Sequence, residues 1–168
     1  PDVNDGKAIR IPQSALKELI SGTIFAVSEN QGRPIHTGVK FEVEDSAISA
    51  IAVDGFRLAR RTFHTEAPTG RDLNFVVPAA GLKEVEKILS DTDEMASFTL
   101  GRKHILFEMG GVTLVCRILE GDFLDYNAAI PKTEKTSIEV STRMLIEGIE
   151  RTSLLISDRL RSPLKLNM

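Results

Sequence analysis

The chain has 168 residues, of which 42% are hydrophobic and 27% charged, so it is globular in composition and long enough for one domain plus part of another. Its formal charge of -3 argues against tight wrapping of nucleic acid, although an acidic body can still carry one basic face. No run of about 18 apolar residues predicts a membrane span, and residues 1–6 lack the basic start and apolar run of a signal peptide. We therefore expect a cytoplasmic protein without membrane contact, whose natural gene begins upstream of Pro1.

A repeated motif organises the chain. The first copy is Ile11-Pro12-Gln13-Ser14-Ala15-Leu16-Lys17-Glu18, and it returns as Val77-Pro78-Ala79-Ala80-Gly81-Leu82-Lys83-Glu84. A weaker third copy begins at Val140. In each copy a short strand is followed by apolar residues at helical spacing. In the first two copies Pro12 and Pro78 can begin the helix, because the missing N–H of proline costs nothing there.

Each of the first two copies predicts five elements. The opening strands are 9–11 and 74–77, and the helices lie near 14–28 and 80–90. Three strands bounded by turn residues follow each helix. These are 38–44, 47–53 and 57–63 in the first copy, and 95–100, 104–109 and 112–118 in the second.

The predicted fold is α+β, with two repeated strand-helix-strand-strand-strand units and helices on one side of antiparallel sheets. Two units complete a domain over residues 1–131, and the polar stretch 131–136 suits a linker. Residues 132–168 would hold the linker and the truncated start of another domain, with a strand at 137–140, a helix, and an end inside the next strand. The chain is therefore expected to be a fragment.

Metal and cofactor chemistry has little support in the sequence. The one cysteine, Cys116, lies in an apolar run, which predicts a buried cysteine on a strand. His36, His64 and His104 are far apart, and no Cys/His cluster has the spacing of metal ligands. We expect no metal, no cofactor and no catalytic residue.

Three segments could carry function. Asp54-Gly55 between two alternating apolar runs predicts a tight hairpin, and the mixture of Phe56, Arg57 and Leu58 beside it suits peptide docking. The stretch 119–131 contains two aromatics without helical or strand period, so it is either a connector held to the core or a segment lying over a site. The stretch 32–38 is a loop, and its lone His36 is more typical of a surface or packing residue than of a catalytic one.

These segments together resemble the bacterial sliding DNA clamps, the beta subunits of DNA polymerase III. Ala-x-Asp-Gly-x-Arg-Leu-Ala at 52–59 is similar to the family's central hairpin, and Gly-x-Phe-x-Asp-Tyr at 121–126 with Ile130-Pro131 to the segment before its third domain. Phe25-Ala26-Val27-Ser28 and the loop around Arg33-Pro34 match the middle domain. The resemblance covers the middle domain and the opening of the third.

The resemblance implies a ring through which double-stranded DNA passes without base-specific contacts. The ring would tether polymerase and clamp-loader subunits through short linear peptides. It would catalyse no reaction and would associate with the nucleoid. The full-length protein would be a head-to-tail homodimer, which is not expected for this fragment. Family helices line the hole, so the implied DNA-facing residues are Lys17, Arg33, Lys83 and Lys87. Ala79-Ala80 depart from the basic residues that many clamps carry there.

The resemblance also implies a peptide pocket between the middle and third domains. Its matching positions are His36, Val53, Gly55, Phe56, Arg57, Leu58, Leu124, Ala128 and Ala129. His36 replaces a commoner aliphatic residue and would make the wall polar and pH-sensitive near its ordinary pKa of about 6.5, while the two alanines would widen the pocket. Because the third domain's C-terminus also builds the pocket, we expect the fragment to bind peptide more weakly than the full-length protein.

Two other classes of function remain open from the sequence. An enzyme using Asp54 and His36 as an acid–base pair lacks any nucleophile elbow, phosphate loop or metal spacing. A stand-alone peptide-binding module derived from the clamp fold would need no ring.

Overall fold

The computed structural model describes residues 7–133, 136–154 and 164–165. The chain divides into two compact units, Pro1–Ala129 and Ile130–Met168, and each is described by itself. The first unit holds all the strands of the described part of the chain. Its elements are β1 (Ile9–Pro12), α1 (Gln13–Ser21), η1 (Ile24–Ala26), η2 (Pro34–Thr37), β2 (Gly38–Val43), β3 (Ala47–Val53), β4 (Leu58–His64), β5 (Leu73–Pro78), α2 (Ala79–Ile88), β6 (Met95–Leu100), β7 (His104–Met109), β8 (Val112–Arg117) and η3 (Tyr126–Ala128).

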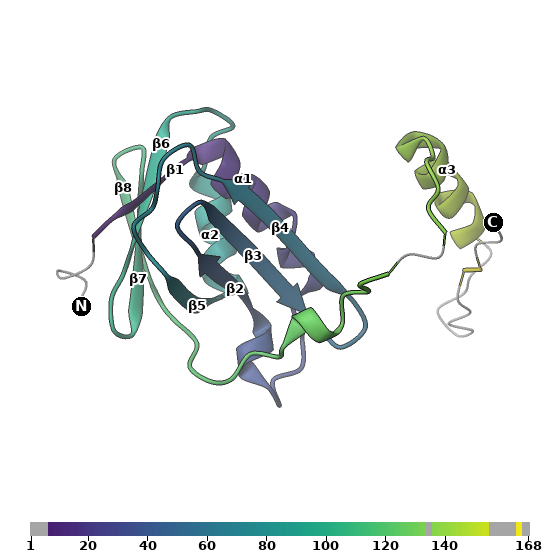
Figure 1. Cartoon of the computed structure of the whole chain (residues 1–168), viewed down its shortest axis with the longest axis horizontal. Coiled ribbons are helices and arrows are strands. Elements are labelled where there is room, and N and C mark those ends of the chain that lie inside the picture. The colour runs from purple at the N-terminus through teal and green to yellow at the C-terminus, as the bar shows by residue number, and fades with distance from the viewer. Residues whose placement is uncertain (1–6, 134–135, 155–163, 166–168) are drawn as a thin grey trace. The chain divides into compact units, whose positions relative to one another are not determined.

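Two four-stranded antiparallel sheets form the first unit, in the orders β1-β6-β7-β8 and β4-β3-β2-β5 (Figure 1). Each repeat therefore contributes its opening strand to the sheet built by the other repeat: β1 pairs with β6, and β5 pairs with β2. The helices α1 and α2 contact each other and lie on the same side of the sheets. This exchange of strands joins the two repeats into one domain, because neither sheet is complete without the other repeat.

The core lies between the helices and the sheets. The helices bury Leu16, Leu19, Leu82 and other apolar residues at helical spacing. Four phenylalanines form a continuous row across both sheets, with ring centroids 5.5, 6.0 and 6.2 Å apart in the order Phe41, Phe75, Phe98, Phe107. Aromatic pairs at such distances add stability beyond the apolar area they bury.

The packing of α2 on β8 confirms the predicted buried cysteine. Cys116 is 9% exposed on β8, and burial raises the pKa of its thiol. A Cβ atom added to Gly81 of α2 would lie 2.6 Å from the Cys116 sulfur. The helix can approach this strand so closely because Gly81 has no side chain.

The predicted strands of the first unit are confirmed to within a residue or two, but the helix predicted near 14–28 is too long. Observed α1 ends at Ser21, and the chain continues through Gly22 and Thr23 into the short turn η1. The buried Thr23 hydroxyl donates to the Leu19 carbonyl at 2.7 Å and so satisfies an acceptor of the last helical turn. The helical spacing of later apolar residues belongs to this turn and not to the helix.

The second unit contains α3 (Thr142–Ser153), as the third copy of the motif predicts. The Ser141 side chain accepts a hydrogen bond from the Met144 N–H, and Arg143 pairs with Glu147 one turn away. The strand predicted at 137–140 is wrong, because those residues have no regular structure. A strand needs a hydrogen-bonded neighbour, and no strand among the described residues pairs with this segment. The strand predicted after α3 lies outside the described residues.

Candidate functional site

The loop between β3 and β4 is a hairpin, as predicted, and Asp54 organises it. Four residues, 54–57, join the paired Val53 and Leu58. The Asp54 carboxylate accepts hydrogen bonds from the Phe56 N–H at 2.9 Å, the Arg57 N–H at 3.0 Å and Arg57 Nε at 2.8 Å. Gly55 has a φ of 94°, which favours glycine. The hydrogen bond from the Phe56 N–H contributes most to lowering the Asp54 pKa, and the hydrogen bonds from Arg57 lower it further.

The hairpin displays an aromatic side chain from a loop of fixed shape. Phe56 is 100% exposed, which is unusual for so large an apolar group. The Arg57 guanidinium lies 6.0 Å from the ring centroid of Phe25, which is also exposed. Because Asp54 fixes the loop before any partner arrives, binding at Phe56 would need little further ordering of the backbone.

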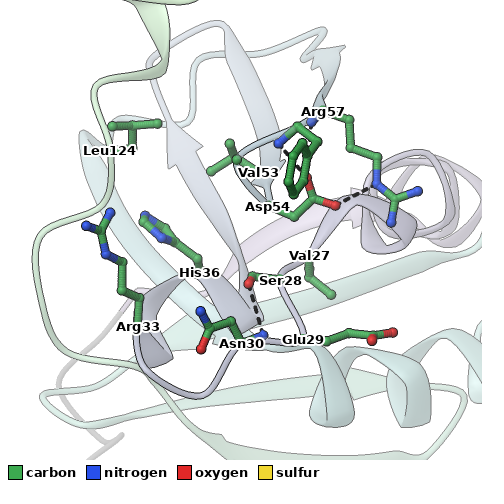
Figure 2. Close-up of a pocket in the computed structure, with 12 residues that line it drawn as sticks. Val27, Ser28, Glu29, Asn30, Arg33, His36, Val53, Asp54, Arg57 and Leu124 are labelled. Carbon is green, nitrogen blue, oxygen red and sulfur yellow. Dashed lines mark hydrogen bonds and ion pairs between the residues drawn. The ribbon is translucent and has the colours of Figure 1, made fainter. Parts of the chain in front are cut away.

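Beside the hairpin lies an open depression of about 660 Å³, within the first unit (Figure 2). Four segments converge on it: the loop after η1, the turn η2 with the residue before it, the hairpin, and the connector after β8. Its lining residues are Val27, Ser28, Glu29, Asn30, Arg33, His36, Val53, Asp54, Gly55, Phe56, Arg57 and Leu124. The lining therefore combines apolar side chains with charged groups of both signs.

The His36 side chain lies between the depression and the connector. Its ring meets the Phe123 ring edge to face, with centroids 5.2 Å apart and planes at 86°. The Nε2 atom is buried and has no hydrogen-bond partner among the residues that the structure describes, while the His36 carbonyl accepts from the Ser28 N–H at 2.8 Å. Burial lowers the His36 pKa below 6.5, and the nearby Arg33 lowers it further. The ring is thus held in its neutral form at neutral pH.

The connector is attached to β2 by a buried tyrosine. Tyr126 is 3% exposed, and its hydroxyl donates to Glu42 Oε2 at 2.5 Å. Lys40 pairs with the other Glu42 oxygen at 2.6 Å, and its ammonium lies 5.5 Å from the Tyr126 ring centroid and 5.8 Å from that of Phe123. The Arg60 guanidinium also lies over the Tyr126 ring. We call Lys40, Glu42, Arg60 and Tyr126 the connector anchor.

The connector anchor shifts the pKa values of its two acids. Burial raises the Tyr126 pKa, and the Glu42 carboxylate raises it further, to about 12. Burial alone would raise the Glu42 pKa, but the hydrogen bonds from Lys40 and Tyr126 outweigh it and hold that pKa below 4.5. At neutral pH the anchor is thus a neutral phenol donating to an ionised carboxylate, which is a strong type of hydrogen bond. The aromatic residues of the stretch 119–131 do hold it to the core, and Leu124 faces the depression at the same time.

Most of the residues that the sequence assigns to peptide binding come together here. His36, Val53, Gly55, Phe56, Arg57 and Leu124 all line the depression. Leu58, Ala128 and Ala129 do not, since Leu58 begins β4 and the two alanines lie at the end of η3. Arg33, which the resemblance assigns to the DNA-facing side, also lines the depression.

The sequence interpretation missed part of the lining and the connector anchor. Residues 27–30 line the depression, and the Phe25–Ser28 motif is the local signal that could have pointed to them. Glu42 and Tyr126 are far apart in the chain, and no local pattern pairs them.

The three predicted DNA-facing lysines lie on the two helices. Lys17 is half-buried on α1, and Lys83 and Lys87 are exposed on α2. Lys87 pairs with Glu84 at 2.8 Å. With Glu18 and Glu86, the two helices carry three lysines and three glutamates, so their summed charge is zero.

Residues 7–133, 136–154 and 164–165 contain neither a metal site nor a membrane-spanning helix. No group of three or more His, Cys, Asp or Glu side chains is arranged to hold a metal ion there. No helix in the described parts of the chain is long and apolar enough to cross a bilayer.

Comparison with known proteins places the chain in a family. Residues 10–125 match the central domain of the DNA polymerase III beta subunit. The beta sliding clamp of Bacillus subtilis is 37% identical over 99% of this chain and 44% of its own length, and that of Halalkalibacterium halodurans is 35% identical over 92% and 41%. The chain therefore spans less than half the length of these relatives.

Solved structures agree with the sequence matches. The crystal structure of the Bacillus subtilis sliding clamp superposes with a TM-score of 0.89 at 38% identity, covering 94% of this chain and 42% of that one. A Pseudomonas aeruginosa sliding clamp bound to griselimycin superposes with a TM-score of 0.82 at 28% identity, covering 92% and 42%. The chain belongs to the bacterial beta sliding clamp family, the beta subunits of DNA polymerase III, and carries their central domain.

Proposed function

We propose that this chain acts as part of a DNA sliding clamp, a non-catalytic processivity factor of the bacterial cytoplasm that encircles double-stranded DNA and tethers the polymerase and other partners. The observation that carries the proposal is the fixed hairpin that displays Phe56 beside the depression. Membership of the clamp family supports it, since the relatives are named as DNA polymerase sliding clamps.

The depression suits a short linear peptide with aliphatic and aromatic side chains. Val27, Val53 and Leu124 offer apolar contacts inside it, and Phe56 stands open at its edge. Binding energy in such sites is concentrated in a few buried apolar anchors. Asp54 neutralises Arg57, whereas Arg33 is exposed and offers a cation to an acidic or carbonyl group of the peptide.

The DNA-facing side is proposed to be that of α1 and α2, through Lys17, Lys83 and Lys87. A surface of zero summed charge would bind phosphates weakly, and weak binding suits a ring that must slide. Tight phosphate binding releases many counterions and would hold the ring in place. We further propose that residues 1–131 are the clamp's middle domain and 132–168 the opening of its third, with the head-to-tail homodimer made by the full-length protein.

The peptide proposal is tested by fluorescence polarisation with a fluorescein-labelled peptide that ends in aliphatic and aromatic residues. We expect the chain to bind it, more weakly than the full-length Bacillus subtilis clamp does. Phe56→Ala should weaken binding about tenfold or more, whereas Val112→Ala, which removes an exposed apolar side chain from β8, should not. Equal binding by wild type and Phe56→Ala, or no binding while the full-length clamp binds, would contradict the proposal.

Griselimycin provides a second probe, because a related clamp is described in complex with it. If the depression is the docking site, griselimycin should compete with the labelled peptide for the chain. Phe56→Ala should weaken the binding of both.

A further inference from the structure

His36 lines the depression and also packs against the connector. Its ring packs edge to face on Phe123, and the next residue, Leu124, lines the depression. Within the described part of the chain the buried Nε2 has no hydrogen-bond partner, which fits a neutral ring whose proton is on Nδ1. A protonated ring would instead bury an N–H without an acceptor, which is unfavourable.

The charged groups around His36 affect the pH at which its imidazole becomes protonated. Arg33 precedes the same short turn, and its cation would repel a charged imidazole. The ammonium group of Lys40 on β2 lies over the Phe123 ring, 5.8 Å from its centroid. The other charged residues that line the depression with His36 are Glu29, Asp54 and Arg57. In the connector, Asp122 and Asp125 flank Phe123 and Leu124 in the sequence. The Asp54 carboxylate already accepts hydrogen bonds from the Phe56 N–H and from Arg57, so it would do little to stabilise a protonated His36 ring.

We propose that His36 is a pH-sensitive contact that holds the Phe123–Leu124 segment against the depression when neutral and releases it when protonated, weakening peptide docking. The effect on peptide docking rests on the proposed function, whereas the release of the Phe123–Leu124 segment does not.

The released part of the connector is limited to its first half. The connector anchor contains Glu42, whose lowered pKa keeps the carboxylate ionised well below the range in which histidine titrates. Tyr126 therefore stays bound to β2 while Phe123 and Leu124 become mobile. The Leu119 N–H, which donates to the Val76 carbonyl at 2.9 Å, fixes the other end.

The direction of the pH effect follows from the His36 pKa, which lies below 6.5 in the folded chain. The contact is fully present above pH 6.5 and is lost as the pH falls through the lower folded pKa. A histidine with an ordinary pKa would titrate nearer to 6.5.

The experiment follows the His36 ring and the Leu124 methyl groups by NMR between pH 7.5 and 5, and measures affinity for the labelled peptide over the same range. In the wild type, Leu124 should shift with the same midpoint as His36, below 6.5, and affinity should fall by about fivefold or more. In His36→Leu and His36→Gln both changes should disappear. His104→Gln, on the distant strand β7, should keep both.

Failure of this proposal can be separated from failure of the proposed function. If His36 titrates while Leu124 stays still, or if the His36 variants keep the full pH dependence, the contact has no such role. If Leu124 moves but peptide affinity is unchanged, the docking part is wrong. If Leu124 moves as expected and no peptide binds to the chain at any pH, the proposed function fails while the pH-sensitive contact stands.

Discussion

Removal of one hydroxyl group tests the connector anchor. Tyr126→Phe deletes the hydrogen bond to Glu42 and keeps the ring that packs under Lys40 and Arg60. A hydrogen bond to a charged group contributes about 1.5–3 kcal/mol. Glu42 retains the Lys40 pair at 2.6 Å, and its side chain is 17% exposed, so water can replace part of what is lost. We therefore expect a loss of about 1.5 kcal/mol in the free energy of unfolding.

Urea unfolding at pH 7, followed by far-UV circular dichroism, measures this loss, and an unchanged m-value would show that the unfolded state is unaffected. Glu42→Gln and the double variant complete a mutant cycle, in which a coupling of about 1 kcal/mol is expected. A loss below about 0.5 kcal/mol, typical of a surface substitution, would refute the reasoning.

The same contact has a spectroscopic signature, because Tyr126 is the only tyrosine and the chain has no tryptophan. Its pKa is raised to about 12, so the absorbance at pH 11 should still be mainly that of the phenol. In urea the Tyr126 phenol of the unfolded chain should titrate near pH 10. The stabilisation by the Tyr126–Glu42 hydrogen bond is present below pH 10 and is lost as the pH rises through the Tyr126 pKa of the folded chain. Native titration near 10 would contradict a strong bond to Glu42.

Three further perturbations have defined outcomes. Asp54→Ala should speed amide hydrogen exchange at Phe56, because the hairpin loses its carboxylate acceptor; unchanged exchange would mean that the loop is fixed by other contacts. Gly81→Ala should destabilise the fold by about 1–2 kcal/mol in urea unfolding, since overpacking against the Cys116 sulfur outweighs the gain in helix propensity. The loss should largely vanish in a Cys116→Ala background, and its persistence there would exclude the sulfur as its cause. The Glu42 contribution to stability should be present above pH 4.5 and lost as the pH falls through its lower folded pKa, and Glu42→Gln should flatten the acid limb of stability.

Local patterns predict the strands of this fold well because alternation and turn residues are local signals. The run 104–109, in which buried and more exposed residues alternate and which ends at Gly110-Gly111, carries both signals, and the observed bounds agree. The exchange of β1 and β5 between the repeats is not predictable in this way. It depends on pairings such as Ile11 with Ala96, which lie far apart in the chain. The end of α1 was missed because the side chain of Thr23 satisfies the helix locally while the apolar spacing continues past it.

In the candidate site, too, the features with local sequence signals are predictable and the long-range contacts are not. The hairpin and the connector carry recognisable motifs, so half of the residues that line the depression could be predicted from the resemblance. The contacts that position those motifs, His36 with Phe123 and Tyr126 with Glu42, join residues from separate loops and strands. Their strength depends on burial, which the sequence does not reveal.

The most direct test of the account is a map of where a clamp-binding peptide contacts the chain. Amide shifts of the 15N-labelled protein on addition of the peptide should concentrate at Phe56, Arg57, His36 and Leu124, the residues around the depression. Shifts concentrated instead in the groove between β1 and residues 63–69, which opens elsewhere on the same unit, would contradict the central claim.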